Sequence, residues 1–405
     1  MNIQIGNNSS LLYHDVKVHL HGTGLSQSGK SKQIELITRQ FVRARKPYIV
    51  VDPNGSLYRN LLDWLAYTRP SHTPILFDAA YGERIPGYNP FRMPEEIRAD
   101  YLMTKTERMT AATIMAGGSM GADGLRLRKF MHAIMYVLLQ QRLPLSSADH
   151  FLNWHSRQRQ SIIDKIDNEG IKEVLTKLYS GTQKAFETYI ESTENRLQLF
   201  LHPHLRRIMG VADNCIDLEE IIENGQSLIL NLQRSDRLSG NTGRILGTLF
   251  INELWELFSK RKTPKEFYLI IDECQLYFTP ELGEMLEQAS KYGLHLMLFH
   301  QTMEQIPSTH KAAIQNAQTK IEFHSKDFQP QERRFMLTRR NGMKYIDDVP
   351  LVKTYPLKPS TVAKYEKQLT KQYMTIEELD KALSNGHKTI HKKDELEDED
   401  FYKRR

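Results

Sequence analysis

The sequence predicts an α/β fold in which a mostly parallel central sheet carries a phosphate-binding loop and is interrupted by a helical insertion. Three observations lead to this prediction. Residues Gly24–Ser31 read GLSQSGKS, which fits the pattern G-x-x-x-x-G-K-[ST]. A strand pattern precedes this motif and a helix pattern follows it. Residues 267–271 form a fully apolar run of strand length that ends in two acidic residues, as a buried parallel strand does.

The flanks of the motif decide whether it is a phosphate-binding loop or a fortuitous turn. Residues 16–20 alternate apolar and polar side chains, which predicts a half-exposed strand. Apolar residues then recur at helical spacing to about residue 45, and residues 48–51 form a short apolar strand. The order strand, loop, helix, strand is the context that a phosphate-binding loop requires, so we favour that interpretation.

The residue types in the loop suit a nucleotide. Gly24 and Gly29 can adopt positive φ, which turns successive backbone N–H groups toward phosphate oxygens. Lys30 would reach the β- and γ-phosphates, and the Ser31 hydroxyl would bind Mg²⁺. Asp52 ends the next strand, where it either faces the phosphates or opens the turn that follows. The expected nucleotide-binding residues are Gly24, Ser26, Gln27, Ser28, Gly29, Lys30, Ser31, Lys32 and Asp52.

Acidic and amide side chains follow two later strands. Asp272 and Glu273 come directly after the apolar strand at 267–271, in the arrangement of a Walker B motif. Asp272 would hold Mg²⁺ together with Ser31, and Glu273 would orient the attacking water. Gln301 follows a strand at 294–299 and would sense the γ-phosphate. The expected catalytic residues are therefore Glu273, Lys30 and Gln301; a solvated acidic turn and a capping glutamine are the alternatives.

Composition sets broad limits on the class of protein. The chain has 405 residues, a net charge of +6 and a pI near 9.0, which is compatible with nucleic acid but weak support for it. No run approaches 18 apolar residues and the first residues lack a signal-peptide pattern, so we expect no membrane insertion. Two cysteines, Cys215 and Cys274, predict neither a disulfide framework nor a cysteine-rich metal site, and we expect a cytoplasmic protein.

The pattern along the chain predicts four segments. Residues 1–95 form the first part of the ATPase core, 96–210 a mainly helical insertion, 211–350 the second part of the core, and 351–405 a charged, largely flexible tail. The last strand is expected at residues 320–324. A glycine-rich break at 116–124 reads more readily as a solvated connection than as a loop that faces a polyanion.

Several short motifs, taken in order, resemble the HerA/FtsK branch of P-loop ATPases, and most closely HerA-like helicases and TraD/TraG-type conjugative coupling ATPases. The resemblance covers roughly residues 15–330 and rests on segments 24–31, 50–55, 87–91, 192–197, 270–275, 291–296 and 300–301. It implies a RecA-like sheet, ATP and Mg²⁺ as cofactors, a homo-oligomeric ring that is usually a hexamer, and DNA moved through its channel. Separately, the small size of the chain suggests a partner subunit, such as a nuclease or another effector protein.

The sequence departs from the family at one functional position. Where members usually carry an arginine that acts on the neighbouring subunit's nucleotide, this chain has Ser290, so Lys291, Arg333 or Arg334 could take that role, or none. We also expect neither the N-terminal membrane helices of coupling ATPases nor the N-terminal β-barrel of HerA proteins.

Three hypotheses about function follow from the motifs. The main one is an ATP-driven DNA translocase or helicase that contacts DNA through residues such as Arg234–Arg237 or Arg126–Lys129. The second is a secretion or assembly motor with a protein cargo. The third is a nucleotide switch that barely hydrolyses ATP.

Overall fold

The computed structural model describes residues 2–384, apart from 117–123, 144, 201, 212–213, 324–327 and 330–332. The chain forms two compact units, one from residues 1–81 and 217–369 and the other from residues 82–216 and 370 onward. The first boundary between the two units therefore lies after residue 81, whereas we expected the first part of the core to extend to residue 95. Residues 351–369 belong to the sheet-bearing unit, whereas we expected a flexible tail from residue 351.

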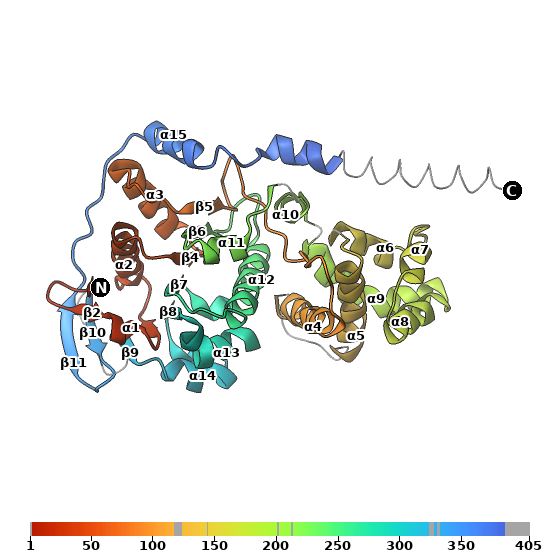
Figure 1. Cartoon of the computed structure of the whole chain (residues 1–405), viewed down its shortest axis with the longest axis horizontal. Coiled ribbons are helices and arrows are strands. Elements are labelled where there is room, and N and C mark those ends of the chain that lie inside the picture. Colours follow the sequence, from red (N-terminus) through yellow and green to blue (C-terminus); the bar gives the residue numbers. More distant parts are fainter. Residues whose placement is uncertain are drawn as a thin grey trace. The chain divides into compact units, whose positions relative to one another are not determined.

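A nine-stranded sheet forms the centre of the first unit (Figure 1), in the order β11-β10-β9-β3-β8-β7-β4-β6-β5. All neighbours from β9 to β5 are parallel, and β10 and β11 extend the sheet with antiparallel pairing. The strands are β3 (Leu20–Thr23), β4 (Tyr48–Asp52), β5 (Ile75–Asp78), β6 (Leu228–Asn231), β7 (Phe267–Ile271), β8 (Leu294–His300), β9 (Thr319–Glu322), β10 (Arg334–Thr338) and β11 (Lys344–Asp348). The predicted α/β fold with a mostly parallel sheet is confirmed.

Helices cover both faces of this sheet (Figure 1). One side carries α2 (Lys30–Ala44), α3 (Ser56–Thr68) and α15 (Pro359–Leu369). The other side carries α12 (Gly240–Ser259), α13 (Pro280–Gln288) and α14 (Ser308–Gln315), and α11 (Leu218–Glu223) precedes β6. Because both faces are covered, the central strands are buried along their whole length, which explains why they read as continuous apolar runs.

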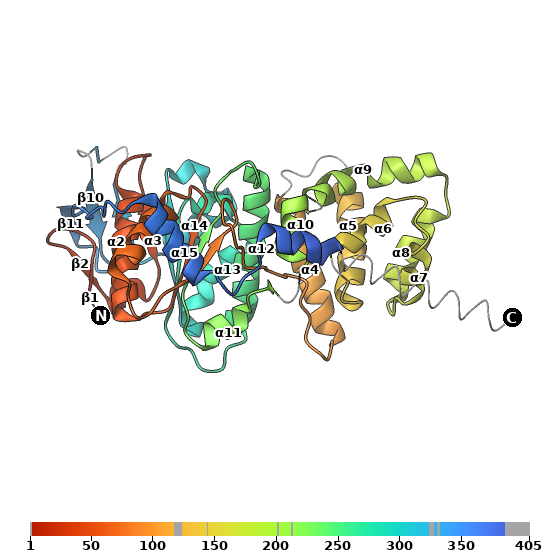
Figure 2. The same ribbon diagram turned by 90° about the horizontal axis from the view of Figure 1, so that it is seen from above.

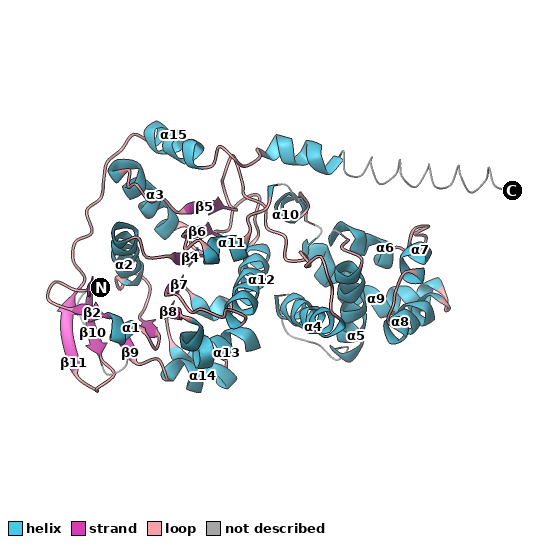
Figure 3. Ribbon diagram, viewed as in Figure 1, coloured by secondary structure: helices cyan, strands magenta, loops and turns pink. Residues whose placement is uncertain are grey.

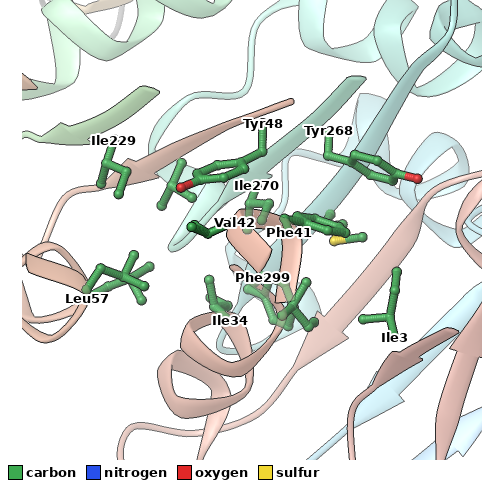
Figure 4. Close-up of a cluster of buried hydrophobic side chains, with 14 of the residues drawn as sticks. Ile3, Ile34, Phe41, Val42, Tyr48, Leu57, Ile229, Tyr268, Ile270 and Phe299 are labelled. Carbon is green, nitrogen blue, oxygen red and sulfur yellow. The ribbon is translucent and has the colours of Figure 1, made fainter. Parts of the chain in front are cut away.

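Apolar side chains fill the space between the sheet and the helices α2 and α3 (Figure 4). Ile34 and Phe41 from α2 meet Ile270 and Phe299 from the sheet, and all four are fully buried. Phe41 stacks on Tyr268 with ring centroids 4.4 Å apart. The helical spacing that predicted α2 is thus the spacing of its core face, and this packing fixes α2, with the loop at its start, on the sheet.

Two short hairpins at one end of the sheet were not predicted. The strands β1 (Asn2–Gln4) and β2 (Ser10–Leu12) pair with each other and lie beside β10 and β11 (Figures 1 and 2). The Asp347 carboxylate of β11 accepts a hydrogen bond from Asn8 N at 2.8 Å, which joins the two hairpins. The strand expected at 320–324 is therefore not the last one.

The first strand of the sheet is displaced from its predicted position. We expected a strand at 16–20, but α1 (Tyr13–Val16) occupies the start of that segment and β3 begins at Leu20. The buried Asp15 carboxylate accepts from Leu12 N at 2.8 Å, and His19 adopts φ +62°. The hydrogen bond to Asp15 and the left-handed backbone at His19 hold a tight helical turn where the alternation alone predicts extended backbone.

The described part of the second unit consists of helices and loops with two isolated bridges (Figure 3). Its helices are α4 (Ala99–Ala116), α5 (Gly124–Gln140), α6 (Asp149–Leu152), α7 (Arg159–Asp164), α8 (Glu169–Tyr179), α9 (Gln183–Phe200) and α10 (Pro203–Met209). Residues 376–384 are also helical, where the sequence suggested a short helix. Most of the glycine-rich break, 117–123, and the charged end, 385–405, lie outside the described residues. Among the described helices, none is long and apolar enough to cross a bilayer.

Candidate nucleotide-binding site

The loop between β3 and α2 has the backbone geometry of an anion cradle. Gly29 adopts φ +112° and directly precedes α2, so the N–H groups at the helix start converge on the loop. The second left-handed position is Gln27, at φ +66°, and not Gly24. Gly24 is required for space instead, because a Cβ there would come within 2.6 Å of Phe323 Cβ.

Lys30 lies inside this loop. Its Nζ donates to the carbonyl oxygens of Gly24, at 2.5 Å, and Leu25, at 3.0 Å. Burial lowers the pKa of the ammonium, and the nearby carboxylates of Glu273 and Asp272 oppose that shift. Ser28 Oγ is buried in the same loop with no hydrogen-bond partner among the described residues. A buried cation and a hydroxyl without a partner among the described residues, both in the same loop, suit phosphate oxygens.

Ser31 and Asp272 meet across the sheet edge. The Ser31 hydroxyl donates to Asp272 Oδ2 at 3.2 Å, although the two residues are 241 positions apart. Asp272 is 1% exposed, and burial, reinforced by the charges of Asp52 and Glu273, raises its pKa to about 7. A hydroxyl beside a buried carboxylate that lacks full charge compensation supplies the oxygen ligands that Mg²⁺ prefers, so these residues fit the expected ion.

Asp52 belongs to a turn. Its Oδ1 accepts from Asn54 N and Gly55 N, both at 2.9 Å, and its Oδ2 accepts from Tyr58 N at 2.8 Å. Both oxygens therefore cap the start of α3. Of the two interpretations left open by the sequence, the structure favours the turn, and Asp52 acts on the site through the charge that it places near Asp272.

Glu273 and Gln301 are in direct contact. Gln301 follows β8, which lies between the loop strand β3 and the acidic strand β7. Its Nε2 donates to Glu273 Oε1 at 3.2 Å, and Gln275 Nε2 donates to Glu273 Oε2 at 2.6 Å. Glu273 itself adopts φ +48°, a left-handed conformation that directs its side chain after the strand ends. Two amides thus hold the carboxylate in one orientation.

A pair of buried histidines lies behind the loop. His21 on β3 and His300 on β8 stack with ring centroids 4.8 Å apart, and their Nε2 atoms are 2.5 Å apart. His300 Nδ1 lies 2.9 Å from the Thr302 carbonyl oxygen, which only accepts, so Nδ1 carries the proton. His300 Nε2 is then the acceptor for His21 Nε2–H. The pair joins β3, which leads to the loop, to β8, which Gln301 follows.

In the part of the chain that the structure describes, the other residues predicted from the sequence form no side-chain hydrogen bond with Lys30, Asp272 or Glu273. Ser26 and Gln27 are exposed on the loop, and the Lys32 side chain pairs with Glu35 at 2.9 Å, so Lys32 can offer the site its backbone N–H. Ser290 Oγ donates to the Lys17 carbonyl at 2.8 Å and is a structural residue.

The candidate finger and DNA-binding residues are distributed over several elements. Lys291 is exposed, and Arg334 pairs with Asp348. Arg234 and Arg237 are exposed on the loop after β6. The segment 126–129 lies in the first turns of α5, and not on a loop as expected.

Sequence reasoning missed three features of the site. Gln275 stands two residues after Glu273, a spacing that could have suggested a contact. The His21–His300 pair and the position of Arg333 next to the loop depend on strand order, which local patterns do not carry. Arg333 Cα lies 3.3 Å from the position that a Cβ on Gly29 would take.

Together the fold and the loop define a RecA-like P-loop NTPase architecture. The unbound bacterial conjugative coupling protein TrwBdeltaN70 has a similar structure, with a TM-score of 0.61 and 14% identity over 87% of this chain and 90% of that chain. The plasmid coupling protein TrwB in complex with ADP and Mg²⁺ gives a TM-score of 0.53 and 15% identity, over 87% and 82% of the two chains. TrwB in complex with a non-hydrolysable ATP analogue gives 0.54 and 15%, over 89% and 83%.

These similarities show a shared fold. They agree with the resemblance to coupling ATPases that the motifs suggested. No protein-family model matches the sequence, and no curated protein matches it either.

Proposed function

We propose that this chain is an ATP-hydrolysing motor that moves DNA. One observation carries the proposal: Lys30 and Ser31 at the start of α2, Asp272 and Glu273 after β7, and Gln301 after β8 converge at one edge of the sheet. The solved structures of TrwB with ADP and Mg²⁺, and with an ATP analogue, have the same fold and support ATP and Mg²⁺ as the ligands here.

Each residue has a distinct task in this proposal. Lys30 leaves the carbonyl oxygens of its own loop and neutralises the β- and γ-phosphates. Ser31 and Asp272 would hold Mg²⁺, which would supply positive charge to offset that on the phosphates. Glu273, oriented by its two amide donors, polarises the attacking water, and Gln301 responds to the loss of the γ-phosphate. Hydrolysis thereby changes contacts at the end of β8.

We take DNA as the cargo because the structural neighbours include a conjugative coupling protein. Arg234 and Arg237 are exposed after β6, at the same edge of the sheet as the nucleotide site, where a change on hydrolysis would reach them. Contacts from such arginines are mainly to phosphates and are sensitive to salt. A homo-oligomeric ring, with six subunits as the expected number, would surround the DNA, and a nuclease or other effector protein would act with it.

Steady-state ATP hydrolysis tests the proposal. Wild type and Lys30→Ala are compared without nucleic acid, with single-stranded DNA and with duplex DNA, at two salt concentrations. We expect turnover that requires Lys30 and rises with DNA more strongly at low salt. Turnover that requires Lys30 but ignores DNA would contradict the DNA motor and favour a protein cargo. Binding of ATP without measurable turnover in any condition would favour a nucleotide switch.

A further inference from the structure

Arg333 stands out among residues with left-handed backbone. Arg45 and Arg69 terminate α2 and α3, a common place for this conformation. Gln27 and Glu273 belong to the nucleotide site. Arg142 follows the end of α5, and His19 lies in the short turn between α1 and β3. Arg333, at φ +70°, precedes β10 and follows no helix end. Outside helix ends, a long side chain in this conformation costs energy and is retained where the surrounding structure holds it, often at a functional site.

The contacts of Arg333 show what holds it there. Its carbonyl oxygen accepts from Val349 N at 2.9 Å, and its Nη2 donates to the Val349 carbonyl at 2.6 Å. Arg333 thus accepts one hydrogen bond from Val349 and donates another to it, and Val349 directly follows β11. The antiparallel extension of the sheet by β10 and β11 fixes its position.

That position is beside the chain's own phosphate-binding loop. A Cβ built on Gly29 would lie 3.3 Å from Arg333 Cα and equally close to the ring of Phe323. Phe323, which is buried, continues β9 with a hydrogen bond from its N to the Thr23 carbonyl at 2.8 Å. The loop is therefore backed by the two ends of the β9–β10 connection, and one of those ends carries a guanidinium group.

We infer that Arg333 binds the phosphates of the nucleotide held by its own subunit, and is not a finger that acts on a neighbouring subunit. Nη2 uses one of the five N–H donors of the side chain on the Val349 carbonyl, and the donors that have no partner among the described residues suit phosphate oxygens. The inference rests on the proposed nucleotide site, and it deepens it by assigning a second cation to the same subunit's phosphates.

Equilibrium binding of ADP and of a non-hydrolysable ATP analogue, each with Mg²⁺, tests this assignment. The informative variant is Arg333→Gly, because glycine accepts φ +70° and removes the side chain without backbone strain. We expect its nucleotide affinity to fall about 10- to 100-fold, the range for a lost charged hydrogen bond. Arg333→Lys should recover part of the loss. The neighbour Arg334, paired with Asp348, provides the matched control Arg334→Ala, which should bind like wild type.

Mixing subunits separates action within a subunit from action between subunits. Lys30→Ala chains lack the loop lysine but keep Arg333. Arg333→Gly chains keep the loop lysine but lack the arginine side chain. If Arg333 acts within its own subunit, the mixture shows no more turnover than its two components. Recovery of turnover on mixing would overturn the inference, as would unchanged affinity in Arg333→Gly.

A change in the thermal midpoint of Arg333→Gly with no change in affinity would also overturn it, since a purely structural role has that result. Wild type that binds no nucleotide, or Lys30→Ala that binds as tightly as wild type, would instead overturn the proposed function and this inference with it.

Discussion

The amide of Gln301 donates to the carboxylate of Glu273, with Nε2 and Oε1 3.2 Å apart. The contact joins the end of β8 to the end of β7 and holds the proposed catalytic carboxylate from one side, while Gln275 holds it from the other. A residue that only capped a strand would have no reason to meet this carboxylate. The proposed roles of the two residues are therefore coupled through one hydrogen bond.

Replacing Gln301 by alanine should lower ATP turnover and leave binding unchanged. Gln275 still orients Glu273 in this variant, so we expect kcat to fall about 10- to 100-fold, less than the loss of a general base causes. Glu273→Gln should cost about 10²- to 10⁴-fold in kcat. Steady-state kinetics with saturating ATP measures both. Wild-type kcat in Gln301→Ala would contradict a role for Gln301 in hydrolysis.

Gln275→Ala separates two ways in which Gln301 could act. Gln275 also donates to Glu273 but lies after β7 and not on the neighbouring strand. If both amides only orient the carboxylate, the two variants lose similar activity. We expect the larger loss in Gln301→Ala, because Gln301 also responds to the γ-phosphate in the proposed mechanism.

Gly29→Ala should destabilise the fold and abolish nucleotide binding. A Cβ at φ +112° is strained, and it would lie 3.3 Å from both Arg333 Cα and Phe323 Cε1. The expected loss is about 1–3 kcal/mol of unfolding free energy, measured as a lower thermal midpoint. Gly240→Ala is the control, since a Cβ there meets nothing within 4 Å at the start of α12. Equal thermal midpoints for the two variants would show that the loop tolerates a side chain at Gly29.

The central strands were predictable from the sequence and the edge hairpin was not. Strands such as β7 and β8 are buried on both faces, so they read as apolar runs bounded by polar residues. β11 lies at the edge of the sheet, and its Ile346 is 63% exposed, so its pattern carries no burial signal. Its pairing with β10, and the contact of Asp347 with Asn8, decide that it is a strand.

The part of the candidate site that lies at the carboxyl ends of parallel strands was predictable from the sequence. The carboxyl ends of such strands meet at one edge, so Lys30, Asp272 and Gln301 were expected together and lie together. Asp52 satisfies the same rule, yet its oxygens serve a turn, because the N–H groups that follow it in the chain bind both of them. Arg333 and Gly29 lie close together although more than 300 residues separate them in the sequence. Their proximity depends on the β10–β11 hairpin, which the hydrophobic pattern of the sequence did not predict.

Removing Arg234 and Arg237 together should weaken DNA binding and lower its salt dependence. Each contact with a DNA phosphate contributes about 0.9 to the slope of log affinity against log salt, so the double alanine variant should lose about 1.8. Fluorescence anisotropy with duplex DNA at several salt concentrations measures this slope. Lys262→Ala is the control, because the exposed Lys262 precedes β7 and so lies at the opposite edge of the sheet. A slope unchanged in the double variant would remove this loop from the proposed DNA contact.

The His21–His300 pair predicts how stability depends on pH. Burial, opposed by the hydrogen bond to Thr302 and the charge of Glu273, lowers the pKa of His300 to about 4. Burial, together with the charges of His300 and Lys320, lowers the pKa of His21 as well. In unfolded chains a histidine binds its proton near pH 6.5. The unfolded state therefore binds more protons than the folded state between about pH 6.5 and 4, and stability falls as the pH falls through that range.

Replacing His300 by glutamine should flatten this dependence. A shift from 6.5 to about 4 corresponds to about 3 kcal/mol that the fold loses on acidification, and the variant no longer loses it. Thermal midpoints of wild type and His300→Gln, recorded from pH 7.5 to 4.5, should converge as the pH falls, although the variant starts lower because it gives up a buried hydrogen bond. The exposed His155 gives the control His155→Gln, whose curve should run parallel to that of wild type. Curves for His300→Gln that stay parallel to wild type over the same range would mean that His300 is protonated in the folded protein, and the hydrogen bond from His21 would then have to be reassigned.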